Sequence, residues 1–303
     1  MNNKCRFMFI TAATVLFASA AGLSQQETYN LTGRYAEGAR WLVDTAMKTE
    51  LDFNITDIEG IPSTKNTIST YEERFYEDFS DVKDGDYRIK VNFLIAENTE
   101  SARGMAEKTY ADENLQNKQF TISLDNNRKT YTTEGGAVSG TAQSRLACVN
   151  EFTKLLPSAP VKMNESWNVK PEEISGLMLK GKNASFTKDS FVKCSLKEVA
   201  LTNGVKQAKI AVNAKLSGSL DYTTDEDNNN TNGFKMDITL KGELIMDMDS
   251  TVPVSLSLNG DISIKGVEND PVKKELVGAI TATGKISCTT KYTTRVTDEE
   301  EKK

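Results

Sequence analysis

The chain has 303 residues, 37 of them basic and 43 acidic, with a formal net charge of −6 and no histidine. This negative balance argues against a nucleic-acid partner, because binding to a phosphate backbone depends on clustered Lys and Arg. The lack of histidine excludes His-ligated metal sites and nucleophiles that are activated by an imidazole base.

Residues 1–20 have the pattern of a secretory signal peptide. Lys4 and Arg6 precede an apolar run over residues 7–21, and small side chains at 18–20 suit a signal peptidase. The run is short for a membrane span of roughly 30 Å. We therefore expect an exported protein, periplasmic or extracellular, with no transmembrane segment after cleavage.

Residues 21–156 are expected to form an N-terminal β-rich half. Apolar residues take every second position in two stretches, as in strands with one buried face. They are Trp41, Val43, Met47, Leu51 and Phe53 in the first stretch, and Ile89, Val91, Phe93 and Ile95 in the second. Asp84-Gly85 precedes the second stretch and favours a hairpin turn.

Helical patterns are few. Leu146, Val149, Phe152 and Leu156 lie one or two helical turns apart, and Pro157 ends the pattern. This spacing predicts a helix over 143–156. Pro171-Glu172-Glu173 resembles the first turn of a short second helix.

Residues 157–297 are expected to form a C-terminal antiparallel β meander. Asn203-Gly204 separates two alternating apolar runs and predicts a tight hairpin. Asn259-Gly260 is expected to turn the chain again, and a last strand is expected near 280–292. The acidic tail, 298–303, offers no apolar surface and is expected to be disordered. The predicted fold class is mainly β (α+β with few helices), built of curved antiparallel sheets or half-barrels in meander topology.

Two of the cysteines after the signal peptide fall in alternating strand patterns. These are Cys194 and Cys288, and an oxidising exported compartment would permit a disulfide between them. The alternative is that all the cysteines of the mature chain serve as small buried apolar side chains.

Sequence motifs for catalysis, cofactors or metals are lacking. The cysteines have no CxxC spacing, and neither a Walker loop nor a GxSxG elbow occurs. The acidic segment 225–230 does not fit the EF-hand loop, since Asn230 stands where glycine is required. We predict no cofactor, no metal and no assignable catalytic residue, although a hydrolase that uses paired carboxylates remains an alternative.

A methionine-rich strand is the predicted ligand-binding surface. Methionine is flexible and accepts varied apolar shapes, so this face could hold a lipid or an acyl chain. The alternative is that it is simply the packed face of a covered sheet. The candidate residues are Phe234, Met236, Ile238, Leu244, Met246 and Met248.

One stretch of the chain carries a resemblance to known proteins. Leu155-Leu156-Pro157-Ser158-Ala159-Pro160-Val161-Lys162, which leads into Ser166-Trp167-Asn168-Val169, resembles uncharacterised exported bacterial β-rich proteins with two sheet-rich halves. Leu240 to Leu244, followed by Asp247, is similar to their strand pattern. The resemblance implies a bacterial envelope setting and no activity. An open curved sheet around a helix would also be similar to the periplasmic lipoprotein carriers.

These observations favour a non-enzymatic envelope protein that binds an apolar ligand, such as a lipid, or another envelope protein. A structural or surface-interaction protein without a ligand pocket is the second hypothesis. A carboxylate-based hydrolase is the third. An apolar cavity would indicate the first, and converging carboxylates would indicate the last.

Overall fold

The computed structural model describes residues 27–294, except 33–35, 58, 84–85, 104, 127, 135, 150, 175–183, 224–230, 251 and 270–275. The predicted signal peptide, the Asp84-Gly85 turn, the acidic segment 225–230 and the tail 298–303 lie outside the described residues. Residues 171–174 are helical, as expected for the start of the second short helix.

One antiparallel sheet, with 13 strands over the described residues, contains most of the chain, which confirms the mainly β prediction. Its strands lie in the order β7 (Arg128–Thr133), β6 (Gln119–Asp125), β4 (Asp86–Ala102), β3 (Pro62–Lys83), β2 (Arg40–Asp57), β15 (Leu276–Thr294), β14 (Val252–Asn269), β13 (Thr231–Asp247), β12 (Val205–Thr223), β11 (Phe191–Thr202) and β9 (Ser166–Val169). Off this path, β10 (Ala184–Phe186) pairs with β12 and β5 (Lys108–Ala111) with β4, while β1 (Thr28–Tyr29) and β8 (Val161–Lys162) form a separate pair.

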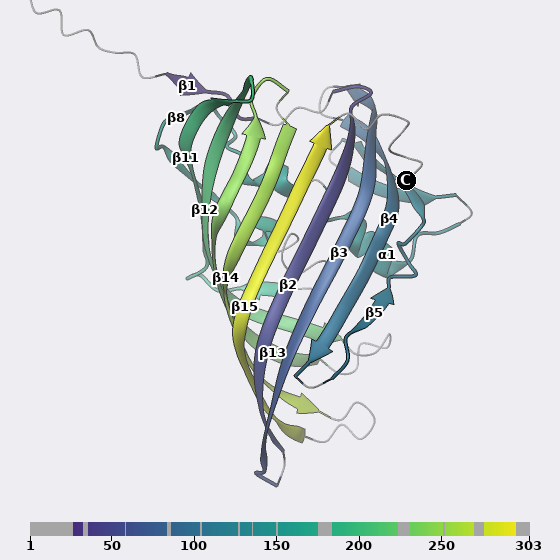
Figure 1. Cartoon of the computed structure of the whole chain (residues 1–303), viewed down its shortest axis with the longest axis vertical. Helices are drawn as coiled ribbons and strands as arrows, with labels where there is room; N and C mark the ends of the chain where they lie inside the picture. Colours follow the sequence, from purple (N-terminus) through teal and green to yellow (C-terminus); the bar gives the residue numbers. More distant parts are fainter. Residues whose placement is uncertain are drawn as a thin grey trace, which may run out of the picture.

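The two predicted halves meet inside this single sheet. β2 pairs with β15 along its length, from Trp41 opposite Thr294 to Asp57 opposite Gly278. β11 to β15 follow one another as the expected meander, and the path ends at β7 and β9 rather than closing. Figure 1 shows the long strands side by side in a sheet that curls around α1, which lies behind it in this view.

The Asn203-Gly204 turn joins β11 to β12 as predicted. Both residues have positive φ, 51° and 81°, as a two-residue hairpin of this type requires. The predicted turn at Asn259-Gly260 is wrong, because β14 runs straight through both residues. Gly260 lies instead at a position where the sheet bends.

Three glycines form an oblique line across the central strands. They are Gly242 on β13, Gly260 on β14 and Gly284 on β15. Each glycine lies two residues along its strand from the residue that pairs with the glycine of the adjacent strand. A Cβ at Gly260 would lie 1.7 Å from the carbonyl oxygen of Thr239, and one at Gly284 would lie 1.8 Å from that of Glu50. Only glycine fits such a close approach, so this line is where the strands can bend.

A helical segment fills the inner side of the curve. The single helix predicted over 143–156 is instead α1 (Gly140–Leu146), a turn, and the 3₁₀-helix η1 (Glu151–Leu155). Ser139 caps α1, since its hydroxyl accepts a hydrogen bond from the Ala142 amide at 3.2 Å. Phe152 in η1 stacks edge-on against Tyr292 of β15, with ring centroids 5.3 Å apart. Leu146, Val149 and Phe152 are buried as the spacing predicts, but because the helix is broken the buried residue of the last turn is Leu155 rather than Leu156.

This segment also bridges the open side of the sheet. Lys129 of β7, at one end of the strand order, donates to the Ala147 carbonyl at 3.3 Å. Trp167 of β9, at the other end, donates from Nε1 to the Leu155 carbonyl at 2.9 Å. The plug formed by residues 140–155 therefore ties together two strands that are distant in the sheet order.

A bulge in β4 corrects one predicted face. Phe93 lies opposite Phe75 and Ile95 lies opposite Arg74, so Leu94 is the extra residue. After the bulge the buried side chain is Ala96 rather than Ile95. Alternation alone cannot reveal such an insertion.

Candidate ligand-binding face

The inner, concave face of the sheet is built from rows of directly opposed residues. Side chains that face each other across a ladder point to the same side, so each row can be followed from strand to strand. One row contains Met47, Cys288, Leu258, Gly242, Val212 and Cys194. The residues between rows point to the opposite, outer face.

The predicted disulfide between Cys194 and Cys288 is not present, because both are free thiols in the structure. They do share the row described above, but the strands β12, β13 and β14 separate them. Three intervening strands put their Cα atoms about 19 Å apart along the sheet, far beyond the reach of a disulfide. Both side chains are buried, and burial raises the pKa of the Cys194 thiol to about 12.

The part of the concave face near the plug is closed and contains a buried ion pair. Arg145, in the last turn of α1, pairs with Glu73 of β3, and its guanidinium lies 4.2 Å from the ring centroid of Tyr71. Burial alone would lower the pKa of Arg145, but the Glu73 carboxylate outweighs it and the pKa is raised. Burial, reinforced by Glu73, raises the pKa of Tyr71. These groups therefore hold the plug against the sheet in fixed charge states.

Glu73 also bears on the hydrolase alternative. Its neighbour Glu72 is exposed and points to the outer face, while Glu73 points inward to Arg145. The two carboxylates therefore diverge, as strand geometry requires. Among the described residues, no group of three or more His, Cys, Asp or Glu side chains is arranged to hold a metal ion.

The part of the concave face away from the plug consists of three apolar rows, which we call the far rows. They contain Leu51, Gly284, Ile262 and Ile238; Phe53, Ala282, Ile264 and Met236; and Ile55, Ile280 and Gly266, over which the Phe234 ring lies. Leu51, Phe53, Ile55, Ile264 and Ile280 are only partly buried. Phe53, Ile55 and Ile280 lie outside the set of side chains packed on the core. Large apolar groups thus remain accessible here.

Five of the six residues predicted from the methionine-rich strand, all except Met248, lie on one face of β13. Met236, Ile238, Leu244 and Met246 are buried in the core, whereas Phe234 and Met248 are partly buried against it. Met248 lies just beyond the end of β13. The Phe234 ring lies over Gly266, since a Cβ there would be 2.4 Å from it. The accessible apolar surface is therefore centred on β2, β14 and β15, and Phe234 and Met236 border it.

Sequence reasoning missed most of this accessible surface. Leu51 and Phe53 were recognised as one strand face, but nothing in the alternation separates a covered position from an uncovered one. The plug contacts the long strands at Tyr71, Glu73 and Tyr292, among other positions, so which strand positions it covers depends on tertiary structure.

A hollow of about 540 Å³ adjoins the far rows at the edge formed by β3, β4 and β5. Ser69, Glu100 and Lys108 face one another in one row of its floor, and Thr67 faces Ala102 in the next. Met105 and Tyr110 stand at its rim, 71% and 52% exposed. The hollow opens on the concave side, since its floor residues alternate with the outward-facing ones.

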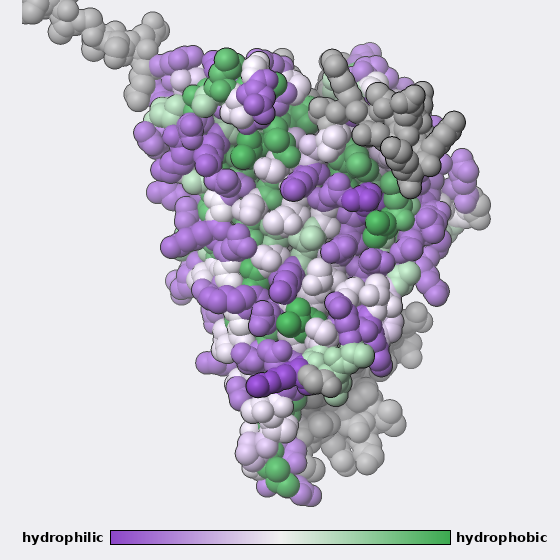
Figure 2. All heavy atoms as spheres, viewed as in Figure 1, coloured by the Kyte–Doolittle hydropathy of each residue, from purple (hydrophilic) through white to green (hydrophobic). Residues whose placement is uncertain are grey.

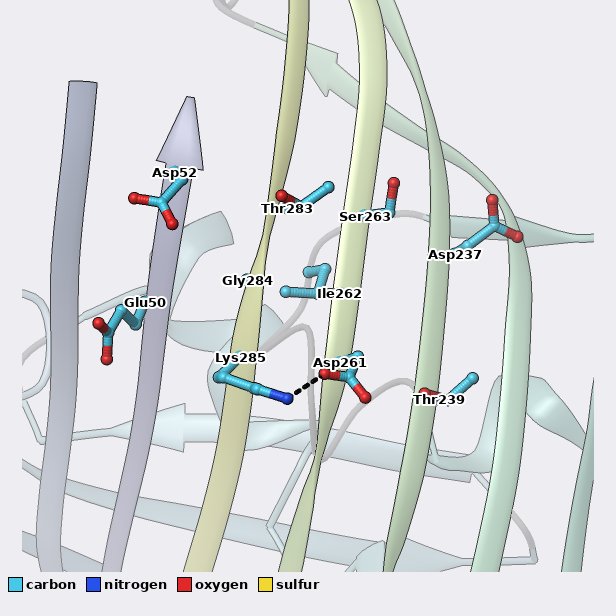
Figure 3. Close-up of a pocket in the computed structure, with 10 residues that line it drawn as sticks. All are labelled: Glu50, Asp52, Asp237, Thr239, Asp261, Ile262, Ser263, Thr283, Gly284 and Lys285. Carbon is cyan, nitrogen blue, oxygen red and sulfur yellow. Dashed lines mark hydrogen bonds and ion pairs between the residues drawn. The ribbon is translucent and has the colours of Figure 1, made fainter. Parts of the chain in front are cut away.

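The outer face is different in character. Figure 2 shows mostly hydrophilic and near-neutral residues over the central strands, with scattered hydrophobic ones. A shallow depression of about 510 Å³ lies beside Gly284. Figure 3 shows Glu50, Asp52 and Asp237 around it, with Lys285 paired to Asp261. Most of the side chains that line the depression are charged or carry a hydroxyl group.

Taken together, the fold and this face define an open, strongly curved antiparallel sheet with a helical plug over part of an apolar concave surface. No described helix combines the length and the hydrophobicity that crossing a membrane demands.

No family model and no curated protein matches this chain. Among solved structures it is similar to lipovitellin, from a study of lipid–protein interactions, at a TM-score of 0.43 and 8% identity. That alignment covers 84% of this chain and 25% of the lipovitellin chain. It is also similar to the Salmonella InvG secretin domain (TM-score 0.16, 8% identity, 88% and 67% covered) and to the E. coli secretin GspD (0.17, 9%, 88% and 52%). Likeness at these TM-scores carries no argument about what this chain does.

Proposed function

We propose that this chain is an exported, non-enzymatic binding protein that holds an apolar ligand on the far rows of its concave face. The observation that carries the proposal is the group of large apolar side chains left partly exposed there, above all Phe53, Ile55 and Ile280. Concave surfaces lined mainly by apolar groups are the usual setting of small-molecule sites.

The contrast between the two faces supports this proposal. Along β2, the outward residues next to Phe53 are Asp52 and Asn54, both exposed and polar. Apolar residues exposed singly on a protein surface are ordinary, but a contiguous apolar group on a concave face indicates a contact with something apolar. Met236 lies at the end of the Phe53 row but is buried in the core, so the accessible apolar side chains of this row are Phe53 and Ile264.

The proposal is tested with the full chain purified from its own envelope under mild conditions. Native mass spectrometry with organic extraction should detect a co-purifying apolar compound. The neutral dye N-phenyl-1-naphthylamine should bind and fluoresce, and the variant Phe53→Asp should weaken its binding at least about tenfold, since a carboxylate in an apolar site costs more than 1.4 kcal/mol.

The matched control is Asn54→Asp, which adds the same charge to the same strand on the outer face and should leave dye binding unchanged. Urea unfolding of both variants shows whether the fold is intact. If neither a co-purifying compound nor dye binding is found with folded protein, the carrier proposal is wrong and the interaction-protein alternative takes its place.

A further inference from the structure

We propose that the hollow between β3, β4 and β5 binds the anionic headgroup of a long-chain amphiphile whose chain lies on the far rows. This inference rests on the proposed function and names the ligand class of the same face. It is drawn from the position of two lysines relative to the apolar rows.

The hollow is in register with the far rows. Lys65, which lines the hollow, lies directly opposite Phe53, and Thr67 lies opposite Leu51. A single strand spacing of about 4.8 Å therefore separates the polar floor from the apolar surface. The row that begins at Lys65 continues through Phe53, Ala282 and Ile264 to Met236. Ala282 and Met236 are buried, so an acyl chain would rest on Phe53 and Ile264. The three spacings from Lys65 to Ile264 amount to about 14 Å.

The charges in the hollow favour an anion. Lys65 and Lys108 are exposed, and neither forms an ion pair with a described residue. Two lysines and one carboxylate, that of Glu100, line the hollow, so positive groups outnumber negative ones there. Asn98 Nδ2 donates to Glu100 Oε1 at 2.8 Å, and Ser69 donates to Asn98 Oδ1 at 2.9 Å. In a chain of formal charge −6, two lysines beside an apolar surface are a local site for negative charge.

The size and the rim of the hollow fit a headgroup. Its volume of about 540 Å³ is within the range of roughly 300–1,000 Å³ that is typical of small-ligand sites. The exposed Met105 and Tyr110 at the rim offer apolar contact where the chain of an amphiphile would leave the headgroup. Hydrocarbon alone would need no such polar hollow at the edge of the apolar rows.

The test compares two ligands with the same chain, palmitate and monopalmitoylglycerol, by displacement of N-phenyl-1-naphthylamine from the full chain. We expect palmitate to bind about tenfold more tightly, the effect of one charge-assisted contact, and to lose this advantage as salt is raised. The double variant Lys65→Glu/Lys108→Glu should abolish the preference and leave the affinity for monopalmitoylglycerol within about twofold. Lys48→Glu, an exposed lysine on the outer face of β2, is the matched control and should change neither affinity.

The outcomes separate the two proposals. The headgroup assignment is wrong if the unaltered chain binds both ligands with equal affinity, or if the double variant loses the same factor of affinity for both. The apolar site stands in either case. Failure of the dye and both ligands to bind folded protein overturns the proposed function itself.

Discussion

Arg145, in the last turn of α1, forms an ion pair with Glu73 of β3 in which both side chains are about nine-tenths buried, at 9% and 10% exposure. The pair joins the helical plug to the middle of the concave face, and Tyr71 packs under the guanidinium. Buried charges are costly unless they are paired. The attachment of the plug therefore depends on both members being present.

Replacing Arg145 by Met should lower the free energy of unfolding by about 3–5 kcal/mol, because the Glu73 carboxylate is left buried without its partner. Urea denaturation followed by far-UV circular dichroism measures this loss. The double variant Arg145→Met/Glu73→Leu should recover more than half of it, since no unpaired charge remains.

The exposed pair of Arg88 and Asp81 is the control for this prediction. Its atoms are 2.8 Å apart, but the two side chains are 51% and 63% exposed. Arg88→Met should therefore cost less than about 1 kcal/mol. If Arg145→Met costs no more than Arg88→Met, the ion pair does not hold the plug.

The burial of Cys194 predicts a loss of stability in alkali. Its pKa is raised from 9.0 to about 12 by burial, so above pH 9 the unfolded chain releases a proton that the folded chain retains. This thiol leaves the free energy of unfolding unchanged well below pH 9 and lowers it as the pH rises toward 12. The loss at pH 10 is about 1.4 kcal/mol.

Cys194→Val removes the titrating group, so its unfolding free energy should fall less between pH 7 and pH 10 than that of the unaltered chain. Denaturation curves at the two pH values measure the difference. The raised pKa of Tyr71 acts in the same direction above pH 10 and is shared by both proteins. An identical fall in both would show that Cys194 ionises freely in the folded state.

The strands were largely predictable because alternation records which face is buried. Val192, Cys194 and Leu196 fall on one face of β11 as expected, and Asn203-Gly204 supplies the turn. Asn259-Gly260 has the same local chemistry, yet it lies within β14. The difference is tertiary, since the Gly260 backbone approaches Thr239 where the sheet bends, and no local pattern records that approach.

The candidate site was only partly predictable. The methionine-rich face of β13 was identified as one surface, but Met246 is core and the accessible apolar groups lie mainly on other strands. The hollow at Lys65 and Lys108 depends on β3, β4 and β5 meeting at one edge. The hollow forms because segments that are distant in sequence pair with one another, and this pairing cannot be predicted from the residue pattern within each strand.

The hydrogen bond from Trp167 to the plug predicts a separate effect on stability. Trp167→Phe leaves the Leu155 carbonyl without this donor and should cost about 1–3 kcal/mol. The substitution should accelerate amide hydrogen exchange more in residues 151–155 than in α1, because the lost contact lies at the η1 end. Equal acceleration in both helices would mean that the plug responds as one unit.

The close backbone approach at Gly260 predicts that replacing glycine by alanine destabilises the protein there but not at Gly140. Gly260→Ala places a Cβ 1.7 Å from the Thr239 carbonyl oxygen, so the strands must shift, and we expect a loss of about 2–3 kcal/mol. Gly140→Ala, at the start of α1, meets no atom within 4 Å and should be neutral or stabilise by up to about 1 kcal/mol. Thermal or urea unfolding of the two variants measures both effects. If Gly260→Ala is as well tolerated as Gly140→Ala, the curvature of the sheet does not depend on glycine at that position.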